Sequence, residues 1–146
     1  MQIITDANKL RKKSTDVDTT DIKKVQQMVF KMNGVLAAHS DGVGLAAPQV
    51  GILQRLFITR KGKKFMAFIN PIITGFSSGE SIGTEGCLSF PGMFGKVERP
   101  SAISLSYIGM NGQRRQMEYS GFEARVIQHE IDHLNGILCI DQFEEE

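Results

Sequence analysis

The sequence has few cysteines, no long apolar stretch and no excess of charge of either sign. Its two cysteines, Cys87 and Cys139, lie far apart, which excludes the disulfide framework of a small secreted protein. No stretch approaches the length needed to cross a membrane, and the first residues, MQIITDANKLRKK, lack the apolar segment of a signal peptide. We therefore expect a soluble, cytoplasmic protein that works in a reducing compartment.

The charge balance and the length bound the class of protein further. Seventeen basic and sixteen acidic residues give a formal net charge of +1, which excludes a strong general attraction to nucleic acid or to anionic membranes. Two short basic clusters, at residues 11–13 and 61–64, are interpreted as solvated surface. No repeat, low-complexity tract or linker is visible. We expect residues 1–146 to form a single domain that acts as a monomer.

The apolar pattern is helical before Gly42 and strand-like after it. Between Asp21 and Ser40, apolar residues recur at spacings of three and four, which predicts one apolar helical face, with Thr20 or Asp21 as the N-cap. Lys61-Gly62 predicts a tight turn, and Asn111-Gly112 predicts a type I′ hairpin turn. The strand candidates are residues 55–60, 65–70, 102–107 and 113–119, of which we expect the last two to pair.

A second helix is predicted to begin at Ser120 and to end at Asn135-Gly136. Ser120-Gly121-Phe122-Glu123 matches a capping box, and Gly136 accepts the left-handed conformation of a helix end. Apolar residues on both sides of this helix indicate that it lies deep in the fold. The fold class is therefore α+β: a compact domain of mostly antiparallel strands around a central helix.

That helix carries an H-E-x-x-H motif at residues 129–133. Residues four apart lie one above the other on a helix, so His129 and His133 can both reach one metal ion, while Glu130 is free to move a proton. A bare motif of this kind also occurs on ordinary solvated helices. Two histidines on a buried helix need polar partners, however, and a metal ion satisfies both at once.

Two cysteines compete for the place of a third metal ligand. Cys139 occupies the final position of H-E-x-x-H-x-x-G-x-x-H, with Gly136 as its glycine, and would suit a metallopeptidase. It lies in the apolar run 137–140, which is typical of a buried strand or core segment. Cys87 lies upstream between Gly86 and Pro91. Either cysteine with two histidines leaves a fourth position open, which is typical of catalytic sites.

A non-enzymatic alternative is a closed, four-ligand metal site that stabilises a binding module. His39 is its candidate fourth ligand, although we interpret His39 as an ordinary residue in the last turn of the first helix. The glycine-rich stretch 42–49 literally fits G-x-G-x-x-A, but a helix precedes it and Pro48 blocks a following helix, which excludes a dinucleotide fingerprint. The stretch is either a surface turn or a segment that passes close to a ligand and presents the amide of Gln49.

Three segments together resemble the signature motifs of peptide deformylases, in the order that this family has them. They are residues 42–49, 85–89 and 128–136. Leu10-Arg11-Lys12 also resembles the usual N-terminal run, and Phe90-Pro91-Gly92 resembles one branch of the family. The resemblance extends over nearly the whole chain, and the three motifs jointly are far more specific than any one of them.

By this resemblance the chain removes the N-formyl group from formyl-methionyl peptides and releases formate during the maturation of newly made proteins. The resemblance implies one divalent metal per chain, usually Fe²⁺ in the cell, with Zn²⁺, Ni²⁺ or Co²⁺ able to substitute. The ligands would be Cys87, His129 and His133, with Glu130 as general acid/base. Gln49 and the backbone N–H of Leu88 would bind the oxyanion. The substrate-binding residues would be Val43, Gly44, Gly86, Phe122 and Val126.

Two departures from the family pattern stand out. Many members carry an acidic and a basic residue where this chain has Gly92 and Phe94, so contacts with the peptide beyond methionine are expected to differ. This also leaves open a member that no longer deformylates. Many bacterial members continue into a C-terminal helix that helps them dock on the ribosome, whereas this sequence stops at residues 144–146. We therefore do not expect ribosome docking, and the length suits a minimal or virus-encoded member.

Overall fold

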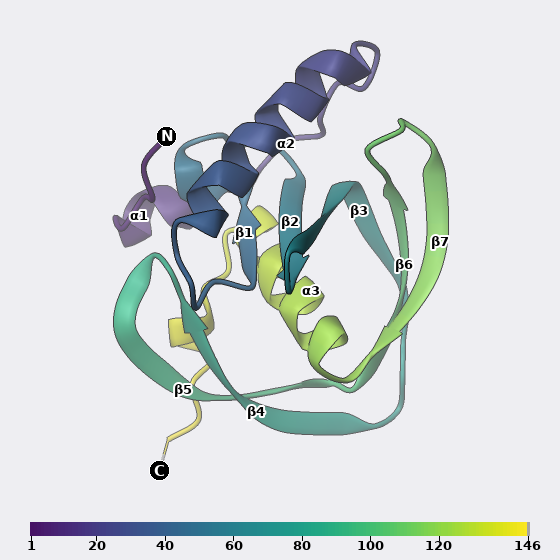
Figure 1. Ribbon diagram of the computed structural model, residues 1–146. Coiled ribbons are helices and arrows are strands. Elements are labelled where there is room, and N and C mark those ends of the chain that lie inside the picture. The colour runs from purple at the N-terminus through teal and green to yellow at the C-terminus, as the bar shows by residue number, and fades with distance from the viewer. Residues whose placement is uncertain (146) are drawn as a thin grey trace.

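Helix α3 (Gly121–Leu134) passes through the centre of the molecule (Figure 1). The structure is a computed structural model, and it describes residues 1–145. Every residue from Ala124 to Leu134 except Asp132 is buried, which confirms the deep position that the sequence predicted. The apolar side chains of α3 pack on a five-stranded sheet, and Arg125, His129 and Asp132 bond to a separate two-stranded hairpin. The α+β class with mostly antiparallel strands is confirmed.

The five-stranded sheet is antiparallel and has the strand order β1-β2-β3-β6-β7. Successive side chains of a strand point to opposite faces. On β2, Leu56 and Ile58 therefore join the core under helix α2, whereas Phe57 joins the core around α3. Apolar side chains fill both cores. The strands are β1 Gly44–Ala46, β2 Leu56–Lys61, β3 Lys64–Phe76, β6 Ala102–Ile108 and β7 Arg114–Ser120.

Helix α2 (Ile22–Ala37) lies where the apolar spacing predicted it, although it ends before Ser40. The carboxylate of Asp21 caps it by accepting a hydrogen bond from the N–H of Lys24 at 3.3 Å. The helix buries one face against the sheet, through Val25, Val29, Met32 and Leu36. A single short turn, α1 (Ala7–Leu10), precedes it and buries Leu10.

The four predicted strands are present as β2, β3, β6 and β7, and the last two pair as predicted. The predicted type I′ turn at Asn111-Gly112 is wrong. Such a turn needs a positive φ at both residues, and only Gly112 has one. Instead the side chain of Asn111 accepts a hydrogen bond from the N–H of Gln113 at 3.0 Å, and residues 109–113 form a longer connection. An asparagine that bonds the backbone two residues on stabilises this turn without a left-handed conformation.

The start of α3 differs from the predicted capping box. Ser120 is the N-cap, but its side chain accepts no capping hydrogen bond. Ser120 is also the last residue of β7, paired with Ala102, and the next residue, Gly121, has a left-handed φ, so the chain does not enter the helix with the geometry that a capping box needs. Gly121 then turns the chain sharply into the helix with a φ of 60°.

A long hairpin of β4 (Glu80–Cys87) and β5 (Phe90–Pro100) was not predicted. Its several glycines resembled loop signals. In the structure Gly86 pairs with Phe94, and the ring of Phe94 lies where a Cβ of residue 86 would be. Such aromatic cover compensates for the missing side chain of a strand glycine. The hairpin wraps around one end of α3 (Figure 1).

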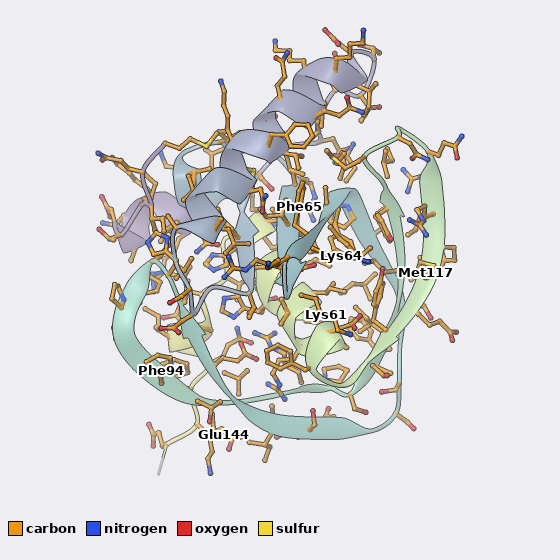
Figure 2. All side chains as sticks on the ribbon, in the orientation of Figure 1. Lys61, Lys64, Phe65, Phe94, Met117 and Glu144 are labelled. Carbon is orange, nitrogen blue, oxygen red and sulfur yellow. The ribbon has the colours of Figure 1, made fainter. Side chains whose placement is uncertain are left out.

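The basic clusters lie on the surface, as interpreted from the sequence. Lys61 and Lys64 flank the turn between β2 and β3 (Figure 2), and the side chain of Lys61 is 88% exposed. Residues 11–13 are exposed as well.

After α3 the chain returns towards the hairpin and packs against it. The run 137–140 lies partly in the core, since Leu138 and Cys139 are buried, but it leads into the 3-10 helix η2 (Cys139–Asp141) and forms no strand. The N–H of Glu144 then donates to the carbonyl of Lys96 on β5 at 2.8 Å. No helix within residues 1–145 is long and apolar enough to cross a membrane.

Candidate active site

Cys87 from β4 and two histidines from α3 come together at one point. The Sγ atom of Cys87 lies 3.3 Å from Nε2 of His133, and one candidate ligand atom from each of Cys87, His129 and His133 lies within 4.8 Å of the others. The two histidine rings are 5.1 Å apart between centroids. Cys87 reaches them because the register of β4 with β5 shifts between Gly86 and Cys87, just before the chain reverses.

The chemistry of these donors fits a transition-metal ion. One sulfur and two imidazole nitrogens suit zinc, iron and related divalent metals. Burial and the positive charge of His129 lower the pKa of His133 to about 3, so this imidazole is neutral and its lone pair is available. Within residues 1–145, two buried polar atoms lack a hydrogen-bond partner, Oε1 of Glu130 and Nδ1 of His133, and unpaired buried atoms of this kind mark a site built for a further group.

Glu130 lies beside this cluster and is suited to proton transfer. Its side chain is buried, and burial raises its pKa to about 7. A carboxylate with a pKa near neutrality can both take up and release a proton at physiological pH. A cation held by the neighbouring ligands would lower that pKa, since it favours the charged form.

Gln49 presents its amide nitrogen to the same place. It belongs to a short 3-10 helix, η1 (Ala47–Val50), and is 1% exposed. Its Oε1 accepts a hydrogen bond from the N–H of Ala46 at 2.9 Å, which fixes the orientation of the amide. Its Nε2 then donates to Sγ of Cys87 at 3.2 Å and to Oγ of Ser89 at 3.1 Å. The stretch 42–49 is thus a largely buried strand and turn against the site, and the alternative of a surface turn is wrong.

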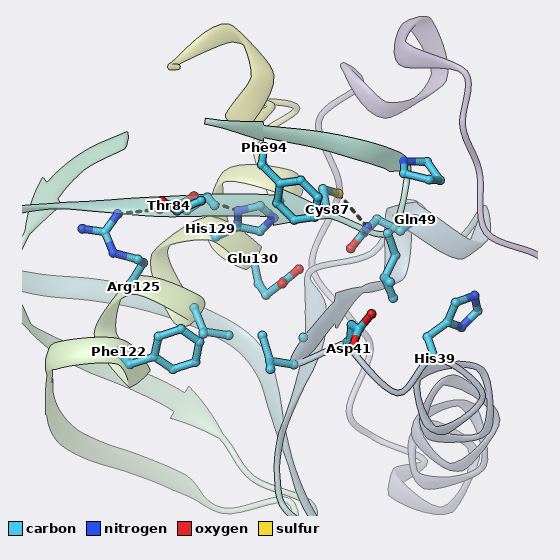
Figure 3. A pocket seen from close by; sticks show the side chains of 18 of the residues that line it. His39, Asp41, Gln49, Thr84, Cys87, Phe94, Phe122, Arg125, His129 and Glu130 are labelled. Carbon is cyan, nitrogen blue, oxygen red and sulfur yellow. Dashed lines mark hydrogen bonds and ion pairs between the residues drawn. The ribbon is translucent and has the colours of Figure 1, made fainter. Parts of the chain in front are cut away.

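A cavity of about 440 Å³ opens beside these groups (Figure 3). Phe94 and Phe122 flank it at 69% and 65% exposure, while Val126 is nearly buried. The cavity is thus mainly apolar next to the polar cluster, as sites for small ligands commonly are. All of the predicted substrate-binding residues line it, namely Val43, Gly44, Gly86, Phe122 and Val126, and so do Gln49, Cys87, Leu88, His129 and Glu130.

A charged network behind His129 was not predicted from the sequence. Nδ1 of His129 lies 2.9 Å from Oε1 of Glu85, and the guanidinium of Arg99 binds both oxygens of that carboxylate at 2.6 and 2.8 Å. Arg99 also donates to Asp132 at 2.9 Å, and Arg125 donates to Glu85 at 2.8 Å. The signal in the sequence was Arg125, a charged residue four positions before His129 on a helix that the sequence predicted to be buried.

The network controls the protonation of its members. Burial alone would raise the pKa of Glu85, but hydrogen bonds from Arg99 and His129 outweigh it and lower the pKa to about 2. Burial alone would lower the pKa of His129, but hydrogen bonds with the thiols of Cys139 and Cys87 and with Glu85 raise it overall. Glu85 is therefore a permanent anion that fixes the Nδ1 side of the His129 ring.

Comparison with known proteins agrees with this geometry. Residues 1–146 match the sequence profile of the family described as Polypeptide deformylase. The chain belongs to this family. A peptide deformylase of Thermotoga maritima is 44% identical over 136 residues, which cover 91% of this chain and 80% of the relative. The resemblance found in the sequence motifs is thereby confirmed, and the relatives are enzymes.

Solved structures of deformylases superpose closely on the chain. A probable peptide deformylase from Synechococcus phage S-SSM7 has a TM-score of 0.93 at 40% identity, and the match covers 98% of this chain and 99% of the phage protein. A class I type b peptide deformylase of Acinetobacter baumannii, solved with Met-Ala-Ser bound, has a TM-score of 0.91 at 31% identity, and the match covers 98% of each chain.

The two alternative metal ligands, Cys139 and His39, lie outside the group formed by Cys87, His129 and His133. Cys139 lies within 4.8 Å of Glu85 and His129, in a group that does not include His133. The thiol of Cys139 is therefore grouped with His129 only, and not with both histidines. His39 lies just beyond the end of α2, exposed, with Nδ1 3.0 Å from the carbonyl oxygen of Val35. It lines the cavity but is not part of a candidate ligand group within residues 1–145.

Proposed function

We propose that this chain is a metal-dependent hydrolase that removes the N-formyl group from formyl-methionyl peptides and releases formate. The observation that carries the proposal is the meeting of Cys87, His129 and His133 with the unpaired carboxylate of Glu130 at one side of an apolar cavity. Residues 1–146 would act as one catalytic domain. Its substrates arise where proteins are newly made, so we place the activity in the cytoplasm.

Cys87, His129 and His133 would hold one divalent metal, which we expect to be Fe²⁺ in the cell, with Zn²⁺, Ni²⁺ or Co²⁺ able to substitute. When bound, the metal would supply Lewis acidity to the formyl oxygen and lower the pKa of a water molecule. Three protein ligands leave room for these groups, which is the arrangement of catalytic rather than structural sites.

Glu130 would move the protons of the reaction. Its carboxylate takes the proton of the water that attacks the formyl carbon, and it later returns this proton to the amine that leaves. The C–N bond breaks, and formate and a free N-terminal methionine result. Gly44 leaves room for this carboxylate, because a Cβ at position 44 would lie 2.5 Å from Oε2 of Glu130.

Gln49 and the backbone N–H of Leu88 would stabilise the negative charge that develops on the formyl oxygen. The amide of Gln49 is already oriented by its bond to Ala46, so only one of its two N–H groups, now directed at Cys87 and Ser89, would have to change partner when the charge appears. Fixed donors of this kind contribute about 3 to 4 kcal/mol to a transition state. Leu88 lines the cavity next to Cys87.

The apolar part of the cavity would accept the methionine side chain. Val43, Phe122 and Val126 provide aliphatic and aromatic surface without a charge of their own. Gly44 and Gly86 also line the cavity, and their missing side chains make room for Glu130 and for the ring of Phe94. The related enzyme from Acinetobacter baumannii has been solved with Met-Ala-Ser bound, a tripeptide that corresponds to the product of such a reaction.

The test is release of formate from formyl-Met-Ala-Ser, measured under nitrogen with iron- or nickel-loaded protein. We expect release from the formylated peptide and none from the acetylated one, because the acetyl group places a methyl where formyl has a hydrogen. Glu130→Gln should keep one metal per chain and lose at least about 100-fold in kcat. Normal turnover by this variant would contradict the role of Glu130.

The metallopeptidase alternative, with Cys139 as third ligand, is tested by replacing each cysteine with serine. Cys87→Ser should abolish metal binding, and Cys139→Ser should keep it, because Cys87 alone lies with both histidines. The opposite result would favour the metallopeptidase. Metal-loaded protein without formate release would instead point to a family member that acts on another substrate, with Gly92 and Phe94 as the positions to change.

A further inference from the structure

We infer that Arg125 is a positioning residue for the metal site: through Glu85 it fixes both the ring of His129 and the strand that carries Cys87. The inference rests on the metal site proposed above and is independent of whether the chain deformylates peptides. Arg125 contacts none of the reacting groups in that scheme, so its effect on the site is indirect.

The carboxylate of Glu85 accepts two donors on each oxygen. Oε1 meets Nδ1 of His129 at 2.9 Å and a guanidinium nitrogen of Arg99 at 2.8 Å. Oε2 meets Nε of Arg99 at 2.6 Å and a guanidinium nitrogen of Arg125 at 2.8 Å. Four charge-assisted bonds leave this buried carboxylate no freedom to rotate. The position of the His129 ring follows, because its Nδ1 has Glu85 as its partner.

Arg125 and His129 both bind Glu85, and they lie one turn apart on the same helix. Figure 3 shows these two side chains on that helix. Residues four apart on a helix lie one above the other. Two points of attachment, unlike one, fix both the rotation of α3 about its axis and its sliding along β4. This matters for metal binding because Cys87 follows Glu85 by two residues on that strand, whereas His129 and His133 lie on the helix.

Arg125 also ties the two strands of the hairpin to each other. It donates to the carbonyl oxygen of Val97 on β5 at 2.8 Å, and to the carbonyl oxygen and hydroxyl of Ser81 on β4 at 2.8 and 3.1 Å. One guanidinium therefore spans α3, β4 and β5. A lysine could not do the same, because its single ammonium lacks the planar fork of donors.

The hairpin has a glycine where this guanidinium passes. A Cβ at position 83 would lie 2.7 Å from Nε and 2.9 Å from Cζ of Arg125. An alanine there must displace the guanidinium, although residue 83 itself touches no ligand. Gly83→Ala is thus a second and independent way to disturb Arg125.

The test is titration of chelator-treated protein with Co²⁺, followed by visible absorption. We expect the Co²⁺ dissociation constant to rise about tenfold to hundredfold in Arg125→Met, and the ligand-field bands to change. Gly83→Ala should raise it in the same direction. The control is Gly75→Ala, also on a strand, where the nearest atom to a new Cβ is 3.8 Å away, and it should bind Co²⁺ as the unaltered chain does.

A double variant separates the proposed role from general damage. If Gly83 acts through Arg125, adding Gly83→Ala to Arg125→Met should change Co²⁺ affinity by less than twofold. Unchanged Co²⁺ affinity and spectrum in Arg125→Met, with only a lowered Tm, would overturn the inference, as would an unaltered chain that binds no Co²⁺. An unaltered chain that binds Co²⁺ through its thiolate but releases no formate would refute the proposed function alone.

Discussion

Gly44 and Glu130 are in direct spatial competition: a Cβ on residue 44 would lie 2.5 Å from Oε2 of Glu130. Gly44 is on β1, which packs against α3. The absence of a side chain at this position therefore gives the buried carboxylate its place beside Cys87, His129 and His133.

Gly44→Ala is predicted to lower kcat by about 10- to 100-fold, because displacement of a general base by a few tenths of an ångström disturbs proton transfer steeply. Metal content should stay at one per chain. The measurement is steady-state formate release beside metal analysis, with Gly75→Ala as the control glycine. Full activity in Gly44→Ala would show that Glu130 does not need its present position.

Gln49→Leu is predicted to lower kcat by about 100-fold with a smaller effect on KM, because the lost amide donor would act on charge that develops only in the transition state. Gln49→Glu is the matched variant: it keeps an acceptor for the N–H of Ala46 and loses the donor. Both should therefore lose activity. Recovery of activity in Gln49→Glu would indicate that residue 49 only supports the loop.

The stability of chelator-treated protein is predicted to depend on pH through Glu85. The folded pKa of Glu85, about 2, is lower than the value of 4.5 for a free carboxyl, so the ionised group stabilises the fold. That contribution, on the order of 3 kcal/mol, is complete above about pH 4.5 and is lost as the pH falls towards 2. The free energy of unfolding, measured with urea at several pH values, should therefore fall as the pH is lowered from about 4.5 towards 2.

Glu85→Gln is the comparison for that experiment. It lacks the titrating group and leaves two buried arginines short of a counter-charge, so at pH 7 it should be less stable by a few kcal/mol. The difference between the two proteins should shrink as the pH falls from 4.5 to 2. A difference that stays constant over this range would show that Glu85 is not ionised in the folded protein.

Phe94 is predicted to set the response to residues that follow methionine. It flanks the cavity and is 69% exposed. Phe94→Arg should raise kcat/KM for a formyl-Met-Asp peptide relative to a formyl-Met-Ala peptide by about fivefold, since an exposed pair contributes up to 1 kcal/mol. Phe76→Arg, an equally exposed aromatic on β3, is the control. Equal ratios in both variants would exclude a contact between Phe94 and the peptide.

Local patterns in the sequence predicted the elements that obey them. The three-and-four spacing between residues 21 and 40 predicted α2, and apolar residues on both sides of α3 predicted its burial, because a helix repeats every 3.6 residues whatever surrounds it. The hairpin of β4 and β5 was missed. Its strands contain glycines at Gly83 and Gly86, whose lack of a side chain is explained by Arg125 on α3 and by Phe94 on the paired strand, not by any local turn.

Part of the candidate site could likewise be predicted from local sequence patterns, and part depended on the tertiary structure. The spacing of His129, Glu130 and His133 is a property of one helix, so the sequence by itself determined that both imidazoles share a face. Residue spacing alone left the third ligand open between Cys87 and Cys139, and only the resemblance to deformylases favoured Cys87. The tertiary structure brings Cys87, which lies on β4 far from α3 along the chain, close to both rings, whereas Cys139, a few residues after His133, groups with Glu85 and His129. The charged network around Glu85 likewise depends on contacts between two strands and a helix, and long-range contacts of this kind leave no periodic trace in a sequence.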